Sequence, residues 1–431
     1  MKKFLQLKLK ILTKIILSKY KPKVVGVTGS VGKTTTKEAI YTVLSSKFRV
    51  RRSIKNYNNE IGVPLSVIDM EMPGRSLWAW AGVFAKACKL IIIRDKNFPE
   101  ILILEMGVDR PGDMEYLVDM VNCDVGVVTS VGPSHLEYFQ TVEKIKKEKG
   151  ILIKHLKKGG YAVLNNDDPL VKSMSDMSTS RLITYGFQEE SSIRAQNLIF
   201  NFEENGDLDD LSGINFKLNY DGSVVPVRLP RAIGYPAIYS SLAAASVGVA
   251  FGMNLVDISS ALSNFYLPPG RMNVIKGIKH TLIIDDTYNA SPQSSISALG
   301  FIERIKVGQD KKKWAVFGDM LELGNYTEQG HREVGKALVK NGFNKLVTVG
   351  ERAWSVGEGA KEQGMSKENI FHFSDNQEAG KFIQRRLEPG DLVFIKGSQG
   401  ARMEKVAKEL MADPVNAENL LVRQEKEWQD Q

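Results

Sequence analysis

The segment 21–40, KPKVVGVTGSVGKTTTKEAI, constrains the fold more than any other part of the chain. The run Val24–Val27 is rich in β-branched residues, which is typical of a buried strand. The residues from Thr34 to Leu44 have the pattern of a helix, and the connection Gly29–Thr34 is short and holds two glycines. The segment therefore predicts a strand, a tight turn and a helix in immediate succession.

The turn has the chemistry of a phosphate-binding loop. Its backbone N–H groups can surround phosphate oxygens, and the N-terminus of the helix adds partial positive charge. Lys33 adds a full charge, and the hydroxyl of Thr34 is suited to Mg²⁺. The glycines allow close approach because they have no Cβ. We expect the nucleotide phosphates to lie against Thr28, Gly29, Ser30, Val31, Gly32, Lys33, Thr34 and Thr35.

One position departs from the general nucleotide loop, which has glycine where this chain has Val27. The motif is thus the shorter form Gly-x-x-Gly-Lys-Thr. The alternative is an ordinary strand–turn–helix with a surface lysine. The strand before the turn and the helix after it favour the phosphate loop.

Beyond this segment, short β-rich runs alternate with helical stretches, which predicts parallel sheets covered by helices. The sequence Pro268-Pro269-Gly270 cannot continue a helix and marks a boundary. We predict an α/β protein with a central P-loop parallel-sheet ATPase domain and a Rossmann-like α/β C-terminal domain. The expected divisions are a basic amphipathic helix at 1–23, the central domain at 24–267 and the C-terminal domain at 268–431.

Two segments break the alternation. Residues 181–230 contain short strands and turns such as Tyr220-Asp221-Gly222, and we expect an antiparallel excursion there. The tail from about Asp413 is polar and mixed in charge, which is typical of a frayed helix.

The formal charge of +8 is concentrated in residues 1–23, which hold eight lysines and no acidic residue. The rest of the chain is near neutral, so no nucleic-acid partner is expected. Leu5, Leu9, Leu12 and Ile16 share one helical face, as in a helix that lies on an anionic membrane. A helix packed on the protein's own body is the equal alternative, and no run is long enough to span a bilayer.

The segment 76–93, SLWAWAGVFAKACKLIII, is apolar but contains Lys86 and Lys89. We expect a buried helix there in preference to a membrane contact. The two cysteines, Cys88 and Cys123, do not have metal-binding spacing, which fits a reducing, cytosolic setting.

Ligands of open α/β sheets gather beyond the carboxyl ends of the strands. In the first domain, Glu105 ends the run ILILEMG and offers a hard oxygen ligand for Mg²⁺ near Thr34. A cap or salt-bridge role is the alternative for this carboxylate. His135 and Lys149 follow later strands, and neither would be remarkable alone.

In the second domain, Asp286 and Asn289 follow the run TLII, and Lys396 and Ser398 follow LVFI. Arg271 comes just after the boundary. Two α/β domains joined by a hinge predict a cleft that closes on a substrate and delivers cationic side chains to phosphate charge.

Six further segments occur in order along the chain: KNYNNEIGVPLSV (55–67), LEMGVDRPGDM (104–114), GPSHLEYF (132–139), DDTYNASP (285–292), GDMLELG (318–324) and IKGSQGARME (395–404). Together they resemble the Mur ligases, the ATP-dependent amide-forming enzymes of peptidoglycan assembly. The likeness spans about residues 24–410, and within the family it is strongest to the members that add D-alanyl-D-alanine to a UDP-N-acetylmuramoyl-tripeptide.

The resemblance implies a role for each matching position. Lys33 and Thr34 would hold ATP phosphates and one Mg²⁺, which Glu105 would share. His135 and Lys149, a lysine often carbamylated in the family, would serve a second Mg²⁺. The remaining implied positions are Arg271 at the phosphates, Asp286 at the ribose, Asn289 at the nucleotide, and Asn58, Asn59, Lys396 and Ser398 at the substrate.

The implied reaction has two steps. A substrate carboxylate attacks the γ-phosphorus of ATP and becomes an acyl phosphate, which the amine of the dipeptide then attacks. The implied partners are a muramyl-peptide and D-alanyl-D-alanine, and we expect a cytoplasmic monomer with possible peripheral contact between residues 1–20 and the inner face of the membrane.

Three departures from the family pattern are visible. The family ligase usually has an N-terminal domain of some eighty residues for the UDP-sugar, which we expect to be lacking because only residues 1–23 precede the loop segment. The family's adenine-seating helix lacks its polar residues here, at Pro236–Ala244. Gln399 replaces a common arginine, and Ile151 replaces a common acid.

These departures leave two other hypotheses open. One is a Mur-type ligase for a different amino-acid or poly-amino-acid substrate, and the other is a membrane-associated nucleotide-binding scaffold without ligase activity. The segments 55–67 and 285–292 favour the dipeptide ligase.

Overall fold

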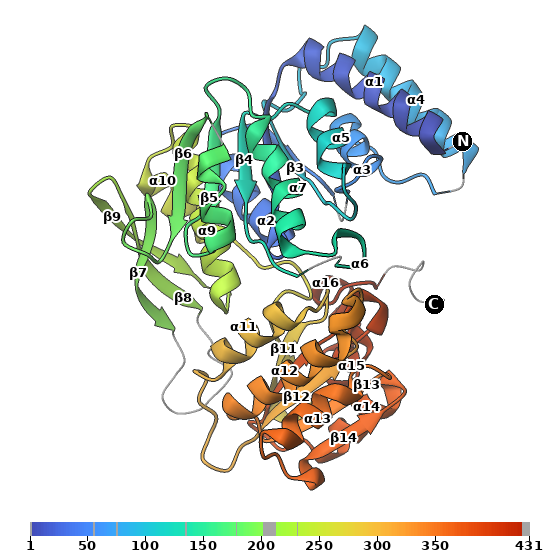
Figure 1. Ribbon diagram of the computed structural model, residues 1–431, viewed down its shortest axis with the longest axis vertical. Coiled ribbons are helices and arrows are strands. Elements are labelled where there is room, and N and C mark those ends of the chain that lie inside the picture. The colour runs from blue at the N-terminus through green and yellow to red at the C-terminus, as the bar shows by residue number, and fades with distance from the viewer. Residues whose placement is uncertain are drawn as a thin grey trace. The chain divides into compact units, whose positions relative to one another are not determined.

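The computed structural model describes residues 2–54, 57–74, 76–133, 136–177, 179–200, 213–230 and 232–424. The chain forms two compact units (Figure 1). The first comprises Met1–Asn197, Phe216–Val227 and Ile238–Phe265, and the second comprises Leu198–Asn215, Arg228–Ala237 and Tyr266–Gln431.

The first sheet has nine strands in the order β2-β3-β1-β4-β5-β6-β7-β8-β9. Its strands are β1 (Lys23–Thr28), β2 (Val50–Arg52), β3 (Ile101–Glu105), β4 (Val125–Val128), β5 (Tyr161–Asn165), β6 (Arg181–Gly186), β7 (Ile193–Phe200), β8 (Ile214–Tyr220) and β9 (Ser223–Leu229). The strands β1 to β6 pair in parallel. The predicted parallel sheet is therefore confirmed.

Helices flank this sheet (Figure 1). They are α1 (Lys2–Tyr20), α2 (Lys33–Ser45), α3 (Gly62–Ile68), α4 (Leu77–Ile92), α5 (Asp113–Met120), α6 (Leu136–Phe139), α7 (Val142–Lys154), α8 (Pro169–Lys172), α9 (Tyr235–Ala250) and α10 (Leu255–Leu262). The predicted helix from Thr34 to Leu44 is α2.

The central strand β1 positions the loop that follows it. Its residues from Val24 onward are buried, as expected for a strand covered on both faces. β1 lies between β3 and β4, and Val27 is the register partner of Glu105. Because parallel strands end at the same edge of a sheet, the register brings Glu105 beside the glycine turn.

The expected antiparallel excursion is only partly present. β6 continues the parallel sheet, and it pairs in parallel with β7 at Tyr185–Gly186. A tight turn joins β8 to β9, and its residues Asp221 and Gly222 have φ of 46° and 75°. Positive φ at both central residues fits a type I′ hairpin turn, which matches the twist of the two strands.

The second unit contains a six-stranded sheet in the order β10-β11-β15-β12-β13-β14. The strands are β10 (Asn273–Gly277), β11 (Thr281–Asp286), β12 (Lys313–Gly318), β13 (Lys345–Val349), β14 (Ile370–Phe373) and β15 (Leu392–Lys396). All neighbours pair in parallel except β10 and β11. The α/β class predicted for this part is confirmed, although β10 and β14 were not predicted.

Helices α11 (Pro292–Ile302), α12 (Thr327–Lys340), α13 (Trp354–Glu362), α14 (Asn376–Arg386) and α15 (Glu404–Leu410) accompany this sheet. The tail does not fray at once. After α15 it forms the short helix α16 (Ala417–Leu420), and the Arg423 side chain is almost fully buried.

Helix α1 packs on the first unit through Leu9, Thr13 and Ile16, which are fully buried. Packing on the protein's own body, one of the two alternatives, is therefore what the structure has.

Helix α4 contradicts the expected buried helix, because only Val83, Ala87 and Leu90 are buried along it. Within the described ranges, no helix is long and apolar enough to cross a membrane.

Candidate active site

The glycine turn between β1 and α2 is shaped by close packing on the segment after β4. A Cβ built on Gly29 would lie 1.9 Å from Oγ1 of Thr129. Gly32 has φ of 88°, a conformation that other residues rarely adopt, and it directly precedes α2. Gly29 is therefore required by the close approach of Thr129, and Gly32 is required by its own backbone conformation.

The N-terminus of α2 is free of side-chain caps and has no acidic residue in its first turn. Its first backbone N–H groups therefore present positive charge to the turn. The Lys33 ammonium folds back over the loop and donates to the carbonyl oxygen of Gly29 at 2.8 Å. This arrangement is a site for a phosphate group.

Glu105 and Thr34 meet at the edge of the sheet. The Thr34 hydroxyl donates to Oε2 of Glu105 at 3.0 Å, and the Asn58 amide donates to Oε1 at 3.2 Å. The Glu105 side chain is almost fully buried, and its backbone N–H bonds the hydroxyl of Ser53 at 3.2 Å. A buried carboxylate beside a hydroxyl is a donor set that suits Mg²⁺ bound to phosphates.

Lys37 explains how the Glu105 charge is tolerated away from water. Its ammonium lies 3.8 Å from Oε2 of Glu105 and 3.4 Å from Oε1 of Glu38, and it donates to the carbonyl of Ser53 at 2.8 Å. A buried carboxylate without such a partner would be strongly disfavoured. Lys37 was not singled out in the sequence, although it lies on the helix turn after Lys33.

Lys149 is buried on α7, whose other lysines lie mostly toward solvent. Burial lowers the pKa of Lys149 well below its usual value, and the nearby Lys33 ammonium lowers it further. Asp109 and Glu148 act in the opposite direction. The lowered pKa favours the neutral form of the Lys149 amine, which is the nucleophilic form.

His135 lies outside the described residues. Among the residues that are described, no group of three or more His, Cys, Asp or Glu side chains could hold a metal ion. In the described part of the site, the hydroxyl of Thr34 and the carboxylate of Glu105 are the groups suited to Mg²⁺.

Asn58 and Asn59 differ in their surroundings. Asn58 contacts Glu105, as described above, so it lies at the site. The side-chain oxygen of Asn59 accepts from the backbone N–H groups of Ile61 and Gly62 at 3.1 and 2.9 Å, at the start of α3. Its carbonyl oxygen therefore shapes this turn.

In the second unit, Asp286 and Lys396 form a buried ion pair with each other. The Lys396 ammonium also donates to the backbone carbonyl of Asn289 at 3.0 Å, and its pKa is lowered by burial although Asp286 opposes this. Ser398 accepts from the backbone N–H of Leu321 at 2.9 Å. Of the four predicted residues, Asp286 and Lys396 thus end the neighbouring strands β11 and β15, and Asn289 and Ser398 lie just after them.

Arg271 stacks its guanidinium 3.9 Å from the centre of the Tyr288 ring. Its Nε atom is buried and has no hydrogen-bond partner in the described part of the chain. A stacked arginine whose Nε donor has no partner is suited to an anion.

The helix that would seat adenine in the family is α9. Its polar positions are used within the protein, because the Ser240 hydroxyl lies 3.2 Å from that of Thr36 on α2. Tyr239 donates to Oδ2 of Asp167 at 3.0 Å. Ser240 and Tyr239 thus tie α9 to its neighbours.

Sequence reasoning missed two structural carboxylates. Glu148 accepts from the backbone N–H groups of Gly112 and Met114 at 3.0 and 2.9 Å and so caps α5. Glu404 is buried between Arg402 and Arg423, at 2.7 and 2.8 Å. The sequence signal for Glu148 was its place on the apolar face of α7. The contact between Arg423 and Glu404 could not be predicted, because the two residues are too distant in the sequence.

The comparisons with known proteins agree with this geometry. Residues 27–81 and 84–227 match the Mur ligase middle domain, and residues 270–399 match the Mur ligase, glutamate ligase domain. The UDP-N-acetylmuramoyl-tripeptide–D-alanyl-D-alanine ligase of Bacillus subtilis is 30% identical over 405 residues, which cover 94% of this chain and 79% of that protein. The ligase of the same name from Mycobacterium tuberculosis is 28% identical over 410 residues, covering 90% and 73%.

Solved structures show the same relationship. The MurF ligase of Thermotoga maritima in complex with ADP superposes with a TM-score of 0.76 at 29% identity, covering 94% of this chain and 83% of that one. MurF from Acinetobacter baumannii gives a TM-score of 0.76 at 26% identity, covering 95% and 80%. The chain has a phosphate loop, two successive α/β units and these relatives. It therefore belongs to the Mur ligase family.

Proposed function

We propose that the chain is an ATP-dependent ligase that joins D-alanyl-D-alanine to a UDP-N-acetylmuramoyl-tripeptide in peptidoglycan precursor synthesis. The single observation that carries the proposal is the buried Glu105 carboxylate bonded to Thr34 at the end of the phosphate loop. The relatives that bear this activity in their names support the choice of substrates.

The loop residues have a defined task in this reaction. The N–H groups at the start of α2 and the Lys33 ammonium hold the ATP phosphates. Thr34 and Glu105 would hold a Mg²⁺, which would supply charge neutralisation at the phosphates. Lys37 fixes Glu105 in place, since it pairs with the carboxylate from the buried side.

Lys149 and His135 are proposed ligands of a second Mg²⁺. A lysine in its neutral form can form a C–N bond with carbon dioxide and release one amine proton to solvent, and the resulting carbamate is an anion suited to a metal. The lowered pKa of Lys149 supports this role, because an ammonium group would not react.

The reaction would proceed through an acyl phosphate. The substrate carboxylate attacks the γ-phosphorus of ATP and ADP leaves. The amine of D-alanyl-D-alanine then attacks the acyl carbon and phosphate leaves, with loss of the amine proton. The task of the protein is to hold the reacting groups in line and to keep water from the acyl phosphate.

The second unit contributes the remaining proposed contacts. Arg271 would bind phosphate, Asp286 the ribose and Asn289 the nucleotide, with Lys396 and Ser398 near the substrate. We place the central domain at 24–267 and the C-terminal domain at 268–431. We further propose that the enzyme acts as a monomer in the cytoplasm, where ATP is available.

Phosphate release measured with both substrates, and with each omitted, tests the function. The proposal expects release only when ATP, the muramyl-tripeptide and D-alanyl-D-alanine are all present. Lys33→Ala should abolish it, while Lys144→Ala, an exposed lysine on α7, should not. Release with other amines but not with D-alanyl-D-alanine would establish a different ligase, and release without any amine would establish a nucleotide hydrolase.

A further inference from the structure

We propose that α1 and α4 together form an apolar ridge that docks on an anionic membrane surface. The ridge consists of the exposed side chains Phe4, Leu7, Ile11 and Ile15 of α1 and Trp78, Ala81, Ala85, Cys88 and Ile92 of α4. The proposal is independent of ligase activity, because none of these residues lies at the candidate active site.

Helix α1 is apolar on two opposite sides. Its inner side is buried on the protein through Leu9 and Ile16. On its outer side Phe4, Leu7, Ile11 and Ile15 recur at intervals of three and four residues and are 62%, 54%, 50% and 43% exposed. A helix held to the body by its inner side has no internal use for a second apolar stripe, so the outer stripe is a binding surface.

Lysines border this outer stripe along both edges. At 100° per residue, Lys3 and Lys14 lie on one side of Leu7 and Ile11, and Lys8 and Lys19 lie on the other. Helix α1 contains no acidic residue. An apolar stripe with lysines on both edges is the pattern of a helix that lies in the interface of an anionic bilayer. Lys14 and Lys19 bind groups of the protein itself, so Lys3 and Lys8 are the lysines that would place their ammonium groups at the phosphates.

Helix α4 widens the ridge. Trp78, Ala81, Ala85, Cys88 and Ile92 follow one another on its exposed side, and Trp78 and Ile92 are 89% and 80% exposed. No acidic residue occurs between positions 76 and 94. Tryptophan at the end of an apolar surface is suited to the headgroup level of a bilayer.

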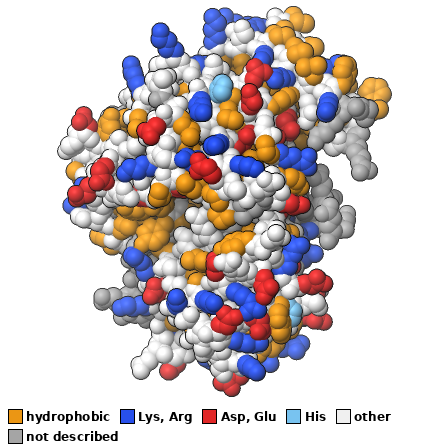
Figure 2. All heavy atoms as spheres, viewed as in Figure 1, with side chains coloured by type: hydrophobic (Ala, Val, Ile, Leu, Met, Phe, Trp, Pro, Cys, Tyr) orange, Lys and Arg blue, Asp and Glu red, His pale blue; other side chains and the backbone are white. Residues whose placement is uncertain are grey.

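The two helices are fixed to each other. Lys19 of α1 donates to the carbonyls of Leu90 and Ile91, at 2.9 Å each, at the C-terminus of α4. Tyr20 donates to the carbonyl of Leu90 at 3.1 Å. Figure 1 shows α1 and α4 side by side, and Figure 2 shows hydrophobic side chains gathered over them with basic side chains near by.

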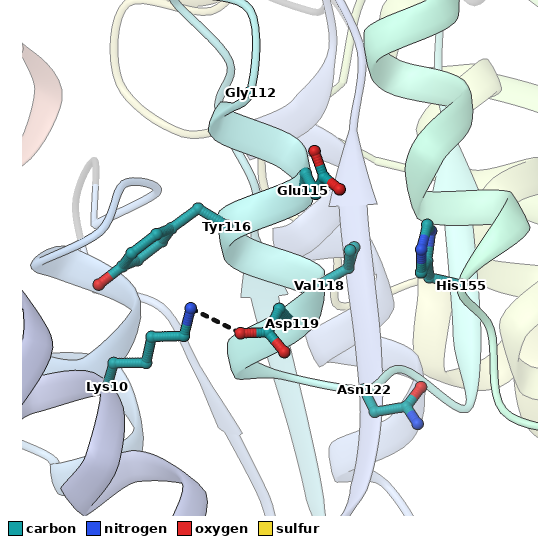
Figure 3. A pocket seen from close by; sticks show the side chains of 8 residues that line it. All are labelled: Lys10, Gly112, Glu115, Tyr116, Val118, Asp119, Asn122 and His155. Carbon is teal, nitrogen blue, oxygen red and sulfur yellow. Dashed lines mark ion pairs between the residues drawn. The ribbon is translucent and has the colours of Figure 1, made fainter.

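The inner attachment of α1 keeps the outer side turned outward. A hollow of about 680 Å³ lies between α1, α5 and the end of α7 (Figure 3). At its rim the Lys10 ammonium lies 2.6 Å from Asp119 and 4.2 Å from the centre of the Tyr116 ring, and Lys14 also pairs with Asp119. These contacts set the rotation of α1 about its axis, so the stripe is presented in a fixed direction.

Charge and composition select lipid as the occupant. A protein partner of neutral charge would not need lysines on both edges of the stripe, and a second copy of this chain would bring lysines against lysines. A surface of anionic phospholipid complements both the apolar stripe and its basic borders.

Flotation of the intact chain with vesicles tests the proposal. Vesicles of phosphatidylcholine with one quarter phosphatidylglycerol should bind the protein, and pure phosphatidylcholine should bind it much less. Leu7→Gln with Ile11→Gln should lower the affinity by about tenfold or more, since the stripe loses its centre. Lys3→Gln and Lys8→Gln should each lower it by about fivefold at low salt.

Matched controls are Val415→Gln, an apolar side chain 92% exposed in the second unit, and Lys381→Gln, an exposed lysine on α14. Both should leave vesicle binding unchanged, and circular dichroism should show all variants folded. Brominated lipids should quench the fluorescence of the wild type more than that of Trp78→Phe.

Three outcomes would overturn the proposal. They are the absence of wild-type binding to anionic vesicles, equal binding by the Leu7→Gln and Ile11→Gln double variant, and a dimer that this double variant abolishes while no vesicles are bound. The last outcome would show that a second copy covers the ridge.

Discussion

The hydroxyl of Thr34 bonds the carboxylate of Glu105 at 3.0 Å, although the two residues are 71 positions apart in the chain. The contact follows from the parallel register of β1 and β3, which sets Val27 beside Glu105. The helix that begins after the loop then brings Thr34 to the same edge. One hydrogen bond thereby joins the phosphate loop to a carboxylate able to bind Mg²⁺.

Glu105→Gln should lower kcat by about a hundredfold or more, because an amide cannot neutralise the metal as a carboxylate does. The measurement is phosphate release against Mg²⁺ concentration, in which the variant should need more Mg²⁺. Glu143→Gln, an exposed change on α7, is the control. A variant with unchanged kcat and Mg²⁺ dependence would exclude Glu105 as a metal ligand.

Lys149→Met should abolish turnover, while Lys147→Met, an exposed lysine on the same helix, should not affect it. Activity of the wild type should fall in buffer freed of carbon dioxide and return when bicarbonate is added. Isotope-labelled bicarbonate should give a carbamate NMR signal that Lys149→Met removes. Full activity in both buffers, with no such signal, would show that Lys149 acts unmodified.

The sequence predicted the parts of the fold that depend on local pattern. The β-branched runs placed the central strands of both sheets, and the position of Glu105 at the end of its run predicted its contact with Thr34. These predictions succeed because the period of a strand and the common edge of parallel strands are set by backbone geometry.

Other features depend on what a side chain packs against. In the sequence, Lys149 resembles the solvated lysines beside it. It lies four residues after Ile145 and three before Leu152, however, and this spacing places it on the buried face of α7. The apolar composition of 76–93 predicted burial, but composition does not state which side of a helix is covered. The contact of Arg423 with Glu404 is made by the tail, whose local sequence is polar.

Arg423→Met should destabilise the second unit by about 2 to 4 kcal/mol, since Glu404 would remain buried with only Arg402 as partner. Arg423 also donates to the carbonyls of Thr287 and Tyr288, at 2.6 and 3.2 Å, so the loop after β11 should loosen. Urea unfolding and hydrogen exchange of residues 287–289 measure both effects. Arg385→Met, an exposed change on α14, should alter neither, and an equal effect of both substitutions would refute the assignment.

Titration of the buried Asp285 carboxyl should make the second unit less stable as the pH rises. Burial raises the pKa of this carboxyl from 3.8 to about 7, against the hydrogen bonds that Thr287 donates to it. Between these two values the folded state holds a proton that the unfolded state has lost, so stability present at low pH is lost as the pH rises toward 7. The loss is on the order of 4 kcal/mol at most.

Asp285→Asn removes this titration while it keeps an acceptor for Thr287, so its stability should stay nearly constant where that of the wild type declines. The measurement is hydrogen exchange of the β11 amides between pH 4.5 and 7.5, corrected for intrinsic exchange rates. Asp310→Asn, an exposed carboxylate in the same unit, should follow the wild type. A decline in Asp285→Asn as steep as that of the wild type would mean that another group carries the proton, because the substituted amide cannot ionise in this range.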